Sequence, residues 1–440
     1  MSSKSKTSGA KEAAKLALVP KLRFPDFLQS PEWNSKPLVD VCSRITQGGT
    51  PDTTKPEYWG GAIRWITPAE MGKSDSPFIQ ESIRTITDHG LRDCASELLP
   101  VNSVILSVRA PIGHLAINTV PMAINQGCKG LIVSKALDSF FLYYSLLVAK
   151  PRLNDLGAGN TFKELGGAVL KNFAIPLPLV AEQQKIAECL SAVDEVIAAQ
   201  ARKLDALKTH KKGLMQQLFP REGETQPRLR FPEFRNAGEW QEAKLVSLSS
   251  GPLSNGVFND PKKVGDGYKL INVSDMYIET TIDESRLALL ALSPSDFKAN
   301  QVSDGDVFFT RSSLVKSGIA VSNIFVGASN DVTYDGHLIR FRPNKNKVIP
   351  LFCHYLFKTA PIRAQLVARG KTATMTTIGQ EDVASVMLFY PGKDEQRRIA
   401  ECLSSLDALI TAETHSREAL RSHKRALMQQ LFPSPDSAHS

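Results

Sequence analysis

The chain has 440 residues, a formal net charge of +8 and a pI near 9.0, with 42% hydrophobic and 22% charged residues. These proportions are typical of a soluble globular protein, and no apolar run reaches the roughly 18 residues that a membrane-spanning helix needs. The composition therefore excludes a membrane protein. The positive charge mildly favours a polyanionic partner.

Neither end of the chain has the pattern of a folded segment. Residues 1–19 carry lysines but lack the apolar core of a signal peptide, so we expect a disordered basic lead-in to a cytoplasmic protein. Residues 434–440 are expected to form a short tail. The six cysteines and eight histidines show no metal-binding spacing. We therefore expect no metal site, and we predict that Cys189 and Cys402, at the same place in the two copies, are buried, reduced thiols rather than redox groups.

The first half of the chain begins with a proline-containing segment and continues into a strand-rich domain. The segment PKLRFPDF starts at Pro20, and its Phe-Pro step predicts an extended strap that packs onto a neighbour. Residues 139–150 have the length and spacing of a helix. We predict a mixed α+β domain at 20–181, with strands beginning at Val39 and over 62–67, 103–109, 114–120, 128–133 and 173–180.

The second half repeats this order with different residues. The segment PRLRFPEF starts at Pro227, and residues 350–360 have the pattern of the matching helix. We predict a linker strap and a second mixed α+β domain at 221–394, each domain being dominated by strands with one internal helix. The predicted strands begin at Val246 and cover 268–273, 306–311, 318–326, 337–342 and 385–391.

A long helix is predicted after each domain, at 182–220 and at 395–433. Aligned at an offset of 213, the two sequences match at 22 of 39 positions without a gap. The domains between the repeats diverge almost completely. The chain is therefore a tandem duplication with two variable inserts.

Each long helix carries apolar residues at alternating steps of four and three, which is the period of a coiled coil. We predict that the helices pair as an antiparallel coiled coil with pseudo-two-fold symmetry, a ruler of roughly 50 Å between the domains. Gln200, Glu413 and Arg417 interrupt the seam, either as contacts that set the register or as a solvated gap. The predicted seam consists of Ile186, Leu190, Val193, Ile197, Leu204, Leu207, Ile399, Leu403, Leu406, Ile410, Leu420 and Leu427.

Two clusters in each domain combine glycine with hydroxyl, amide and basic side chains. DNA phosphates and base edges need such donors, and glycine lets the main chain approach phosphate closely. One cluster alone is equally typical of a surface turn, but the doubling favours contact. Arg109 and Arg311 each close an apolar strand, where an arginine at a sheet edge is an equal alternative. The candidate DNA-binding residues are Gln47, Gly48, Gly49, Thr50, Lys55, Arg64, Arg109, Asn160, Thr161, Lys163, Arg311, Ser312, Lys316, Lys371, Thr372 and Thr374.

No catalytic motif is found, neither a Walker-type phosphate loop nor a G-x-S-x-G elbow. An enzyme would need such a motif, so we do not expect catalysis. The basic runs at 208–212 and 421–425 are explained most simply by the helix dipole, although a contact with DNA or a partner is an alternative. A coiled-coil scaffold with two protein-binding globules remains the alternative function.

A helix of the form EQxxIA…LMQQLFP, following each of two variable regions, closely resembles the DNA-specificity (S) subunit of Type I restriction-modification systems. The resemblance extends from about Leu22 to Pro433. GGTP at 48–51, YWGG at 58–61 and GNTFKEL at 159–165 also resemble that family's target recognition domains. The second insert lacks GGTP and has GKTATMTTI in place of GNTFKEL.

This resemblance implies a non-catalytic subunit of a multisubunit adenine methyltransferase and restriction endonuclease. Each domain would be a target recognition domain that reads one half of a bipartite, asymmetric site in double-stranded DNA. The helices would set the spacer and dock two methyltransferase subunits, and motor/endonuclease subunits would join for restriction. S-adenosylmethionine, ATP and magnesium would be bound by those partners, and this chain would bind no cofactor.

Overall fold

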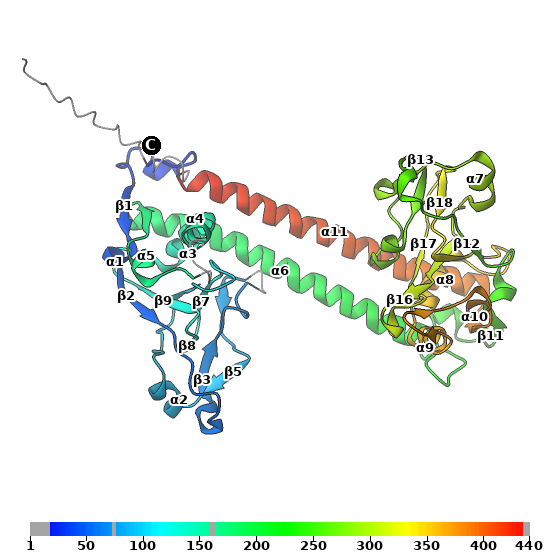
Figure 1. Ribbon diagram of the computed structural model, residues 1–440, viewed down its shortest axis with the longest axis horizontal. Coiled ribbons are helices and arrows are strands. Elements are labelled where there is room, and N and C mark those ends of the chain that lie inside the picture. Colours follow the sequence, from blue (N-terminus) through cyan, green and yellow to red (C-terminus); the bar gives the residue numbers. More distant parts are fainter. Residues whose placement is uncertain (1–17, 73–75, 158–163, 434–440) are drawn as a thin grey trace, which may run out of the picture. The chain divides into compact units, whose positions relative to one another are not determined.

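The computed structural model describes residues 18–72, 76–157 and 164–433, which form two compact units (Figure 1). Unit 1 contains the residues up to Arg202 together with those from His415 onward, and unit 2 contains residues 203–414. Each unit thus holds one strand-rich domain, the nearest part of its own long helix and the far part of the other. The division therefore falls within the two long helices rather than between a helix and its domain.

Unit 1 is built on a five-stranded sheet of order β2-β9-β6-β7-β4, antiparallel except for the β7–β4 pair. A smaller sheet of order β5-β3-β8 and the pair β1–β10 complete it. The strands are β1 (Asn34–Pro37), β2 (Cys42–Gln47), β3 (Trp59–Ile66), β4 (Phe78–Ile79), β5 (Arg84–Ile86), β6 (Val104–Ser107), β7 (Leu115–Asn118), β8 (Met122–Ile124), β9 (Cys128–Val133) and β10 (Ala174–Leu177). The helices are α1 (Leu38–Val41), α2 (Asp88–Asp93), α3 (Ser139–Val148), α4 (Lys150–Gly157) and α5 (Gly167–Lys171).

Unit 2 is built on a four-stranded sheet of order β12-β19-β15-β17, with two three-stranded sheets, β14-β13-β18 and β16-β21-β20, and the pair β11–β22. The strands are β11 (Gln241–Lys244), β12 (Ser254–Asn255), β13 (Val264–Ile271), β14 (Ala288–Leu290), β15 (Val307–Thr310), β16 (Ser312–Ser313), β17 (Ser322–Ile324), β18 (Val332–Tyr334), β19 (Leu338–Phe341), β20 (Lys371–Thr372), β21 (Thr376–Thr377) and β22 (Met387–Tyr390). The helices are α7 (Pro294–Asn300), α8 (Pro350–Phe357), α9 (Ala360–Ala368) and α10 (Gln380–Ala384).

The core of each unit lies between the central strands and an apolar helix, α3 in unit 1 and α8 in unit 2. Both helices were predicted from the spacing of their apolar residues. In unit 1, β6 and β7 are buried along their whole length, and α3 packs on both. In unit 2, β15 is buried along its whole length and α8 packs on β15 and β17. The predicted class, two strand-rich α+β domains each followed by a long helix, is confirmed.

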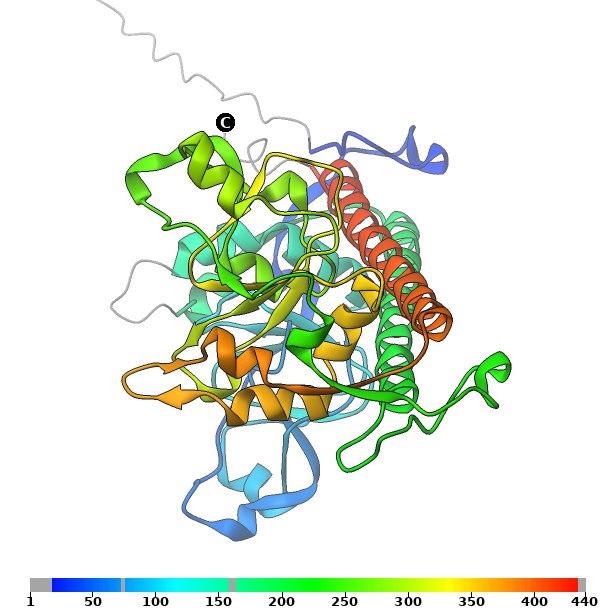
Figure 2. The same cartoon turned by 90° about the vertical axis from the view of Figure 1, so that its right-hand side faces the viewer.

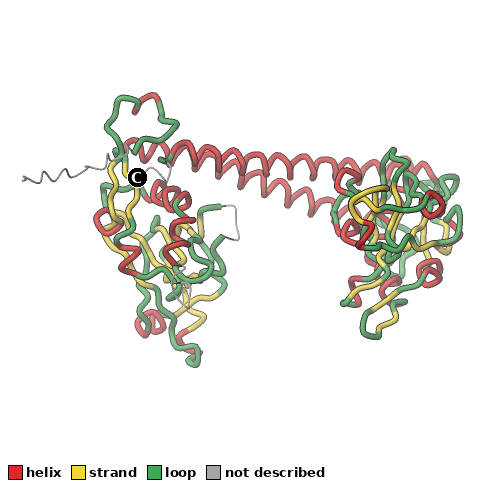
Figure 3. Tube along the Cα trace, turned by 45° about the horizontal axis from the view of Figure 1, so that its top comes forward, coloured by secondary structure: helices red, strands yellow, loops and turns green. Residues whose placement is uncertain are grey.

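The long helices are α6 (Val180–Leu218) and α11 (Lys393–Leu431), each continuous over 39 residues (Figure 3). Antiparallel pairing is visible inside each unit. In unit 2, the Nζ atoms of Lys203 and Lys211 on α6 lie 2.5 Å from the carboxylates of Glu413 and Asp407 on α11, so numbers rise on one helix as they fall on the other. In unit 1, Lys424 on α11 lies 2.6 Å from Asp194 on α6.

All twelve predicted seam residues are buried or partly buried. Ile186 and Leu190 belong to the domain core of unit 1, whereas Ile399 and Leu403 belong to that of unit 2. The first apolar residues of each long helix therefore pack against the domain that precedes that helix. Among the described residues, every helix is either too short or too polar to cross a membrane.

The repeated Glu-Gln pair at the start of each long helix fastens the strap and the internal helix. Arg23 in the first strap donates two hydrogen bonds of 2.8 Å to Glu182, which is 1% exposed. Gln183 accepts a hydrogen bond from Asp138 N, at the cap of α3. In unit 2, the same contacts join Arg230 to Glu395, and Gln396 to Ile349 N at the start of α8. These contacts explain why the strap and the helix repeat together.

Two local predictions were wrong. Val39 does not begin a strand, because it lies in the helical turn α1. Val246 lies in a 3-10 turn, Leu245–Leu248. Spaced valines and leucines fit both a strand and a single helical turn, and in each copy it is the polar segment just before the turn that forms the strand. The domains also hold more than the one internal helix expected.

Candidate nucleic-acid interface

In unit 1, the turn after β2 lies close against the segment that precedes β9. A Cβ atom on Gly48 would lie 1.9 Å from Asn125 O, and one on Gly49 would lie 2.7 Å from Ala95 N, so only glycine fits at either position. Asn125 Nδ2 donates to Thr50 Oγ1 at 2.8 Å. The sequence Gln47–Thr50 therefore forms a tight crossing of two chain segments.

Basic side chains surround this crossing. Lys129 on β9 donates to Gln47 Oε1 at 2.9 Å, and Arg109 Nε lies 3.1 Å from Glu164 Oε2. Burial lowers the pKa of Lys129; Glu164 opposes that shift, while Arg109 and Lys171 add to it. The side chain of Arg109 is 48% exposed. Amide and cationic donors thus stand together at the end of the main sheet.

Two further candidates lie on the smaller sheet and on the turn that leads to it. Arg64 on β3 is 3.2 Å from Glu81, and Lys55 donates to the Tyr58 hydroxyl at 3.0 Å. The Tyr58 hydroxyl raises the pKa of Lys55. Asn160, Thr161 and Lys163 lie outside the described residues.

In unit 2, the structure brings two candidate clusters together although they are about 60 residues apart in the sequence. β16, which carries Ser312, pairs with β21, and β21 pairs with β20, which carries Lys371 and Thr372. The loop between β20 and β21 contains Thr374. In Figure 2 this hairpin, in orange, extends from the body of the unit. Arg311, Lys316, Lys371, Thr372 and Thr374 are all exposed.

The two arginines at the strand ends occupy different places in the two frameworks. The hydroxyl of Ser107 accepts a hydrogen bond from His114 N, and that of Thr310 accepts one from Val321 N, which makes Ser107 and Thr310 equivalent. Arg311 follows Thr310 directly, whereas Arg109 comes two residues after Ser107. The counterpart of Arg109 in unit 2 is therefore Ser312, and Arg311 lies one position earlier.

Several polar residues at this edge were missed by sequence reasoning. In unit 1 they are Asn125, Gln126 and Lys129. In unit 2, Asn255 contacts Gln380 through its side-chain amide at 2.5 Å, and Arg311 N donates to His337 O at 2.9 Å. A signal existed for Asn125, Gln126 and His337, because an Asn-Gln-Gly turn precedes β9 and an Asp-Gly-His turn precedes β19.

The missing GGTP of the second domain also has a structural counterpart. A Cβ atom on Gly256 would lie 1.9 Å from Tyr334 O, and Val257 N donates to that same carbonyl oxygen. In unit 1, a Cβ on Gly48 would meet Asn125 O, and Gly49 N donates to Ile124 O. Asn255-Gly256 in unit 2 therefore forms the same crossing as Gln47-Gly48 in unit 1.

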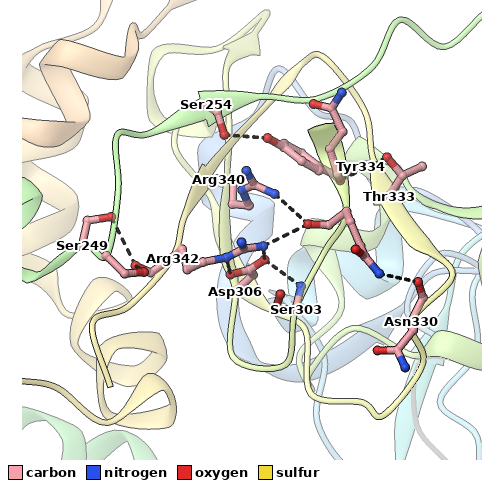
Figure 4. A network of polar contacts seen from close by, with 12 residues as sticks. Ser249, Ser254, Ser303, Asp306, Asn330, Thr333, Tyr334, Arg340 and Arg342 are labelled. Carbon is pink, nitrogen blue, oxygen red and sulfur yellow. Dashed lines mark hydrogen bonds and ion pairs between the residues drawn. The ribbon is translucent and has the colours of Figure 1, made fainter. Parts of the chain in front are cut away.

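A polar network lies next to the crossing at Asn255-Gly256 (Figure 4). Asp306, 1% exposed, accepts hydrogen bonds of 2.8 and 2.7 Å from Arg342, and the hydrogen bonding to Asp306 raises the pKa of Arg342. Arg342 also donates to Gln301 O at 2.9 Å. The Tyr334 hydroxyl lies 2.8 Å from Ser254 Oγ on β12. The network holds β12 and β19 in fixed register with the loop 301–306.

The known proteins that this chain is similar to belong to one group. A family model described as the Type I restriction modification DNA specificity domain matches residues 31–209. The MjaIX specificity subunit of Methanocaldococcus jannaschii is 38% identical over 168 residues, which are 38% of this chain and 39% of that protein. The MjaVIII specificity subunit of the same organism is 24% identical over 311 residues, 68% of this chain and 70% of that protein.

A solved structure has a similar fold over nearly the whole chain. The S subunit of the Type I restriction-modification system from M. genitalium aligns with a TM-score of 0.59 at 15% identity, covering 95% of this chain and 100% of that one. Residues 31–209 thus match the DNA specificity domain of Type I restriction-modification systems, and the chain has the fold of a solved S subunit. At 15% identity the structural likeness shows the fold alone.

The sequence matches cover the first half of the chain better than the second. The family model ends at residue 209, and the alignment with the MjaIX subunit spans well under half of that protein. The second domain is linked to the first by the internal repeat, and it shares the fold of the solved S subunit. Among the described residues, no group of three or more His, Cys, Asp and Glu side chains could hold a metal ion.

Proposed function

We propose that this chain is the non-catalytic DNA-recognition subunit of a Type I restriction-modification complex, in which each unit reads one half of a bipartite, asymmetric site. The observation that carries the proposal is that one framework is built twice with different side chains at its exposed edge. The glycine crossing recurs at Gly48 and Gly256, and the hydroxyl that closes the central strand recurs at Ser107 and Thr310.

The exposed or partly exposed polar side chains beside that framework differ between the two units. Unit 1 presents Gln47, Lys129 and Arg109, and unit 2 presents Asn255, Arg311 and Lys371. Base edges in the major groove present distinct donor and acceptor patterns, so different side chains on one framework read different sequences. Two dissimilar readers fit an asymmetric site, whereas two identical readers would fit a palindrome.

Exposed apolar residues that recur in both copies support the docking of two copies of a methyltransferase subunit. The pairs are Leu22 with Leu229, Val39 with Val246, and Val196 with Leu409. An exposed large apolar side chain contributes little to folding, so its recurrence at matching positions fits a surface used twice by the same partner. Motor/endonuclease subunits would join this assembly, and S-adenosylmethionine, ATP and magnesium would be bound by the partners.

The long helices would set the unread spacer between the half-sites. A helix of 39 residues spans roughly 58 Å, enough to bridge one turn of B-DNA, about 34 Å. Since the proposed substrate is chromosomal DNA, we place the complex in the cytoplasm.

Mapping of methylated adenines tests the proposal. The chain would be expressed with its methyltransferase subunit in cells that lack other adenine methylation, and the genome sequenced with a single-molecule method that detects N6-methyladenine. We expect one motif with two short specified halves and an unspecified spacer of fixed length. A chain that methylates or cuts DNA when purified alone would overturn the non-catalytic assignment. The absence of a motif would favour a protein-binding scaffold.

A further inference from the structure

The loop that follows the central strand is longer in unit 2 than in unit 1. Gly113 and Ala320, both at positive φ, donate their backbone N–H to Ser107 O and Thr310 O, and each follows a buried isoleucine. Between Ser107 and Ile112 unit 1 has four residues, 108–111, and between Thr310 and Ile319 unit 2 has eight, 311–318. The extra residues lie within Ser313–Ser317, which we name the tip loop.

The tip loop is held firmly at its base. Arg363 on α9 donates to the carbonyl oxygens of Ser317 at 3.0 Å and of Ile319 at 2.7 Å. At the tip, Val315 N donates to Ser313 Oγ at 3.2 Å, and Gly318 N donates to Val315 O at 2.9 Å. These hydrogen bonds fix the backbone of the loop, so its exposed side chains are presented in a defined place.

The tip presents two large aliphatic side chains to solvent. Leu314 is 83% exposed and Val315 is 65% exposed. The neighbouring loop of the β20–β21 hairpin carries Met375, also exposed, and β16 at the start of the tip loop pairs with β21. Folding does not require two adjacent aliphatic residues to be this exposed, so they are better explained by a ligand.

The surroundings of the tip are cationic. Arg311, Lys316 and Lys371 are exposed around it, and Asp382 lies 3.8 Å from Lys371. Lysine and arginine beside an apolar tip suit a duplex, whose phosphates attract the cations while base edges or base steps accept the apolar group. A protein partner shared by both units would use surfaces that recur, and this loop has no counterpart in unit 1.

We propose that Leu314 and Val315 contact the bases of the half-site read by unit 2 and determine part of its sequence. This inference rests on the proposed function and names side chains that serve it. Two contacts share the required chemistry, namely packing against a thymine methyl group and insertion between two stacked bases.

The test uses the full chain co-expressed with its methyltransferase subunit, and methylated adenines are mapped genome-wide. The double variant Leu314→Ser/Val315→Ser should lose discrimination at one or two base pairs of one half-site, by about 5- to 100-fold at each. The other half-site should stay unchanged. Val326→Ser, at another exposed apolar position of unit 2, is the matched control and should methylate the wild-type motif.

A second variant replaces Ser313–Ser317 with one alanine. The loop then has the same length as the loop of unit 1, so the fold should tolerate the change. It should relax the same base pairs. If both variants methylate the wild-type motif with wild-type selectivity, the inference fails while the proposed function stands. If the wild-type chain directs no sequence-specific methylation, the proposed function itself fails.

The two contacts are then distinguished with duplexes that carry the mapped motif. Replacing thymine by uracil in the affected half-site should weaken wild-type binding and leave the double variant unaffected if the contact is a methyl group. The fluorescence of a 2-aminopurine placed at the affected base step should rise on binding of the wild-type protein only if a side chain inserts and unstacks the bases. Either response supports base contact, and the lack of both overturns it.

Discussion

Two lysines of the repeated helices each reach an aspartate on the opposite helix, and the burial of the two pairs differs. Lys424 and Asp194 have side chains 13% and 3% exposed, and the Tyr144 hydroxyl donates to the same aspartate at 2.7 Å. Lys211 and Asp407 are 16% and 22% exposed. Since a buried charge that loses its partner stays desolvated, the first pair should be the more sensitive to removal of its lysine.

Lys424→Met should lower the free energy of unfolding by about 3–5 kcal/mol, because the buried Asp194 side chain would lose its cationic partner. Lys211→Met should cost less, since water reaches Asp407. The exposed Lys212→Met is the control, expected within about 0.5 kcal/mol of wild type. Chemical denaturation of the three variants measures this, and an equal cost at Lys424 and Lys212 would contradict it.

Lys358 in unit 2 should make stability depend on pH. Burial lowers the pKa of Lys358 to about 8, and the ammonium of Lys211 adds to that shift. An unfolded lysine titrates near 10.4, so between about pH 8 and 10.4 the unfolded chain binds more protons than the folded chain. The contribution of this group to stability therefore rises with pH in that window.

Lys358→Met should raise the free energy of unfolding at pH 7 by about 1–3 kcal/mol, and this gain should shrink as the pH approaches 10.4. Other titrating groups are present in both proteins, so their effects cancel in the difference between the two unfolding curves. Denaturation of both proteins at pH 7 and pH 10 gives that difference. A gain that is independent of pH would exclude the assigned titration.

The crossing of β12 with the end of β18 is the element on which the proposed reading surface of unit 2 depends. Gly256→Ala places a methyl group against Tyr334 O and should cost about 1–3 kcal/mol, with loss of recognition by unit 2. Gly251→Ala is the matched control, because a Cβ atom there meets nothing within 4 Å. Thermal unfolding measures both, and equal melting temperatures would contradict the crossing.

Helices and strands were predictable where the spacing of apolar residues fitted one of them clearly. They were less predictable where tertiary contacts determine the local structure. The apolar runs gave β9 with its observed bounds, and gave β6, β7, α3 and α8 within a few residues. Val39 was assigned to a strand because spaced apolar residues do not distinguish a short strand from a single helical turn. The pairing of β16 with β21 and the equivalence of Gly48 with Gly256 depend on long-range contacts that no local pattern encodes.

The candidate residues show the same division. Glycine-rich turns pointed to Gln47–Thr50 and to the Arg311 and Lys371 clusters, which do lie at the ends of strands. Lys129 and Asn255 were missed because a lone lysine in a strand and a lone asparagine in a turn carry no signal of their own. The partners of Lys211 and Lys424 on the opposite helix were also missed, since a helix dipole accounts equally well for a basic run.

For the whole molecule, the duplication makes one prediction about spacing. Inserting seven residues into both α6 and α11 keeps the apolar period and lengthens each helix by about 10 Å. The spacer should grow by up to about three base pairs, at 3.4 Å per base pair, with both half-sites unchanged. Methylation mapping reads this directly, and altered half-sites with the old spacer would contradict the ruler.

The central claim is that each unit reads its own half of the site, and a pair of single variants tests it most directly. Arg109→Ala and Arg311→Ala, each co-expressed with the methyltransferase subunit, are compared by genome-wide mapping of methylated adenines. The account predicts that each variant relaxes one half-site, that the two halves are different, and that the spacer stays the same. Relaxation of the same half by both variants, or of both halves by either one, would contradict it.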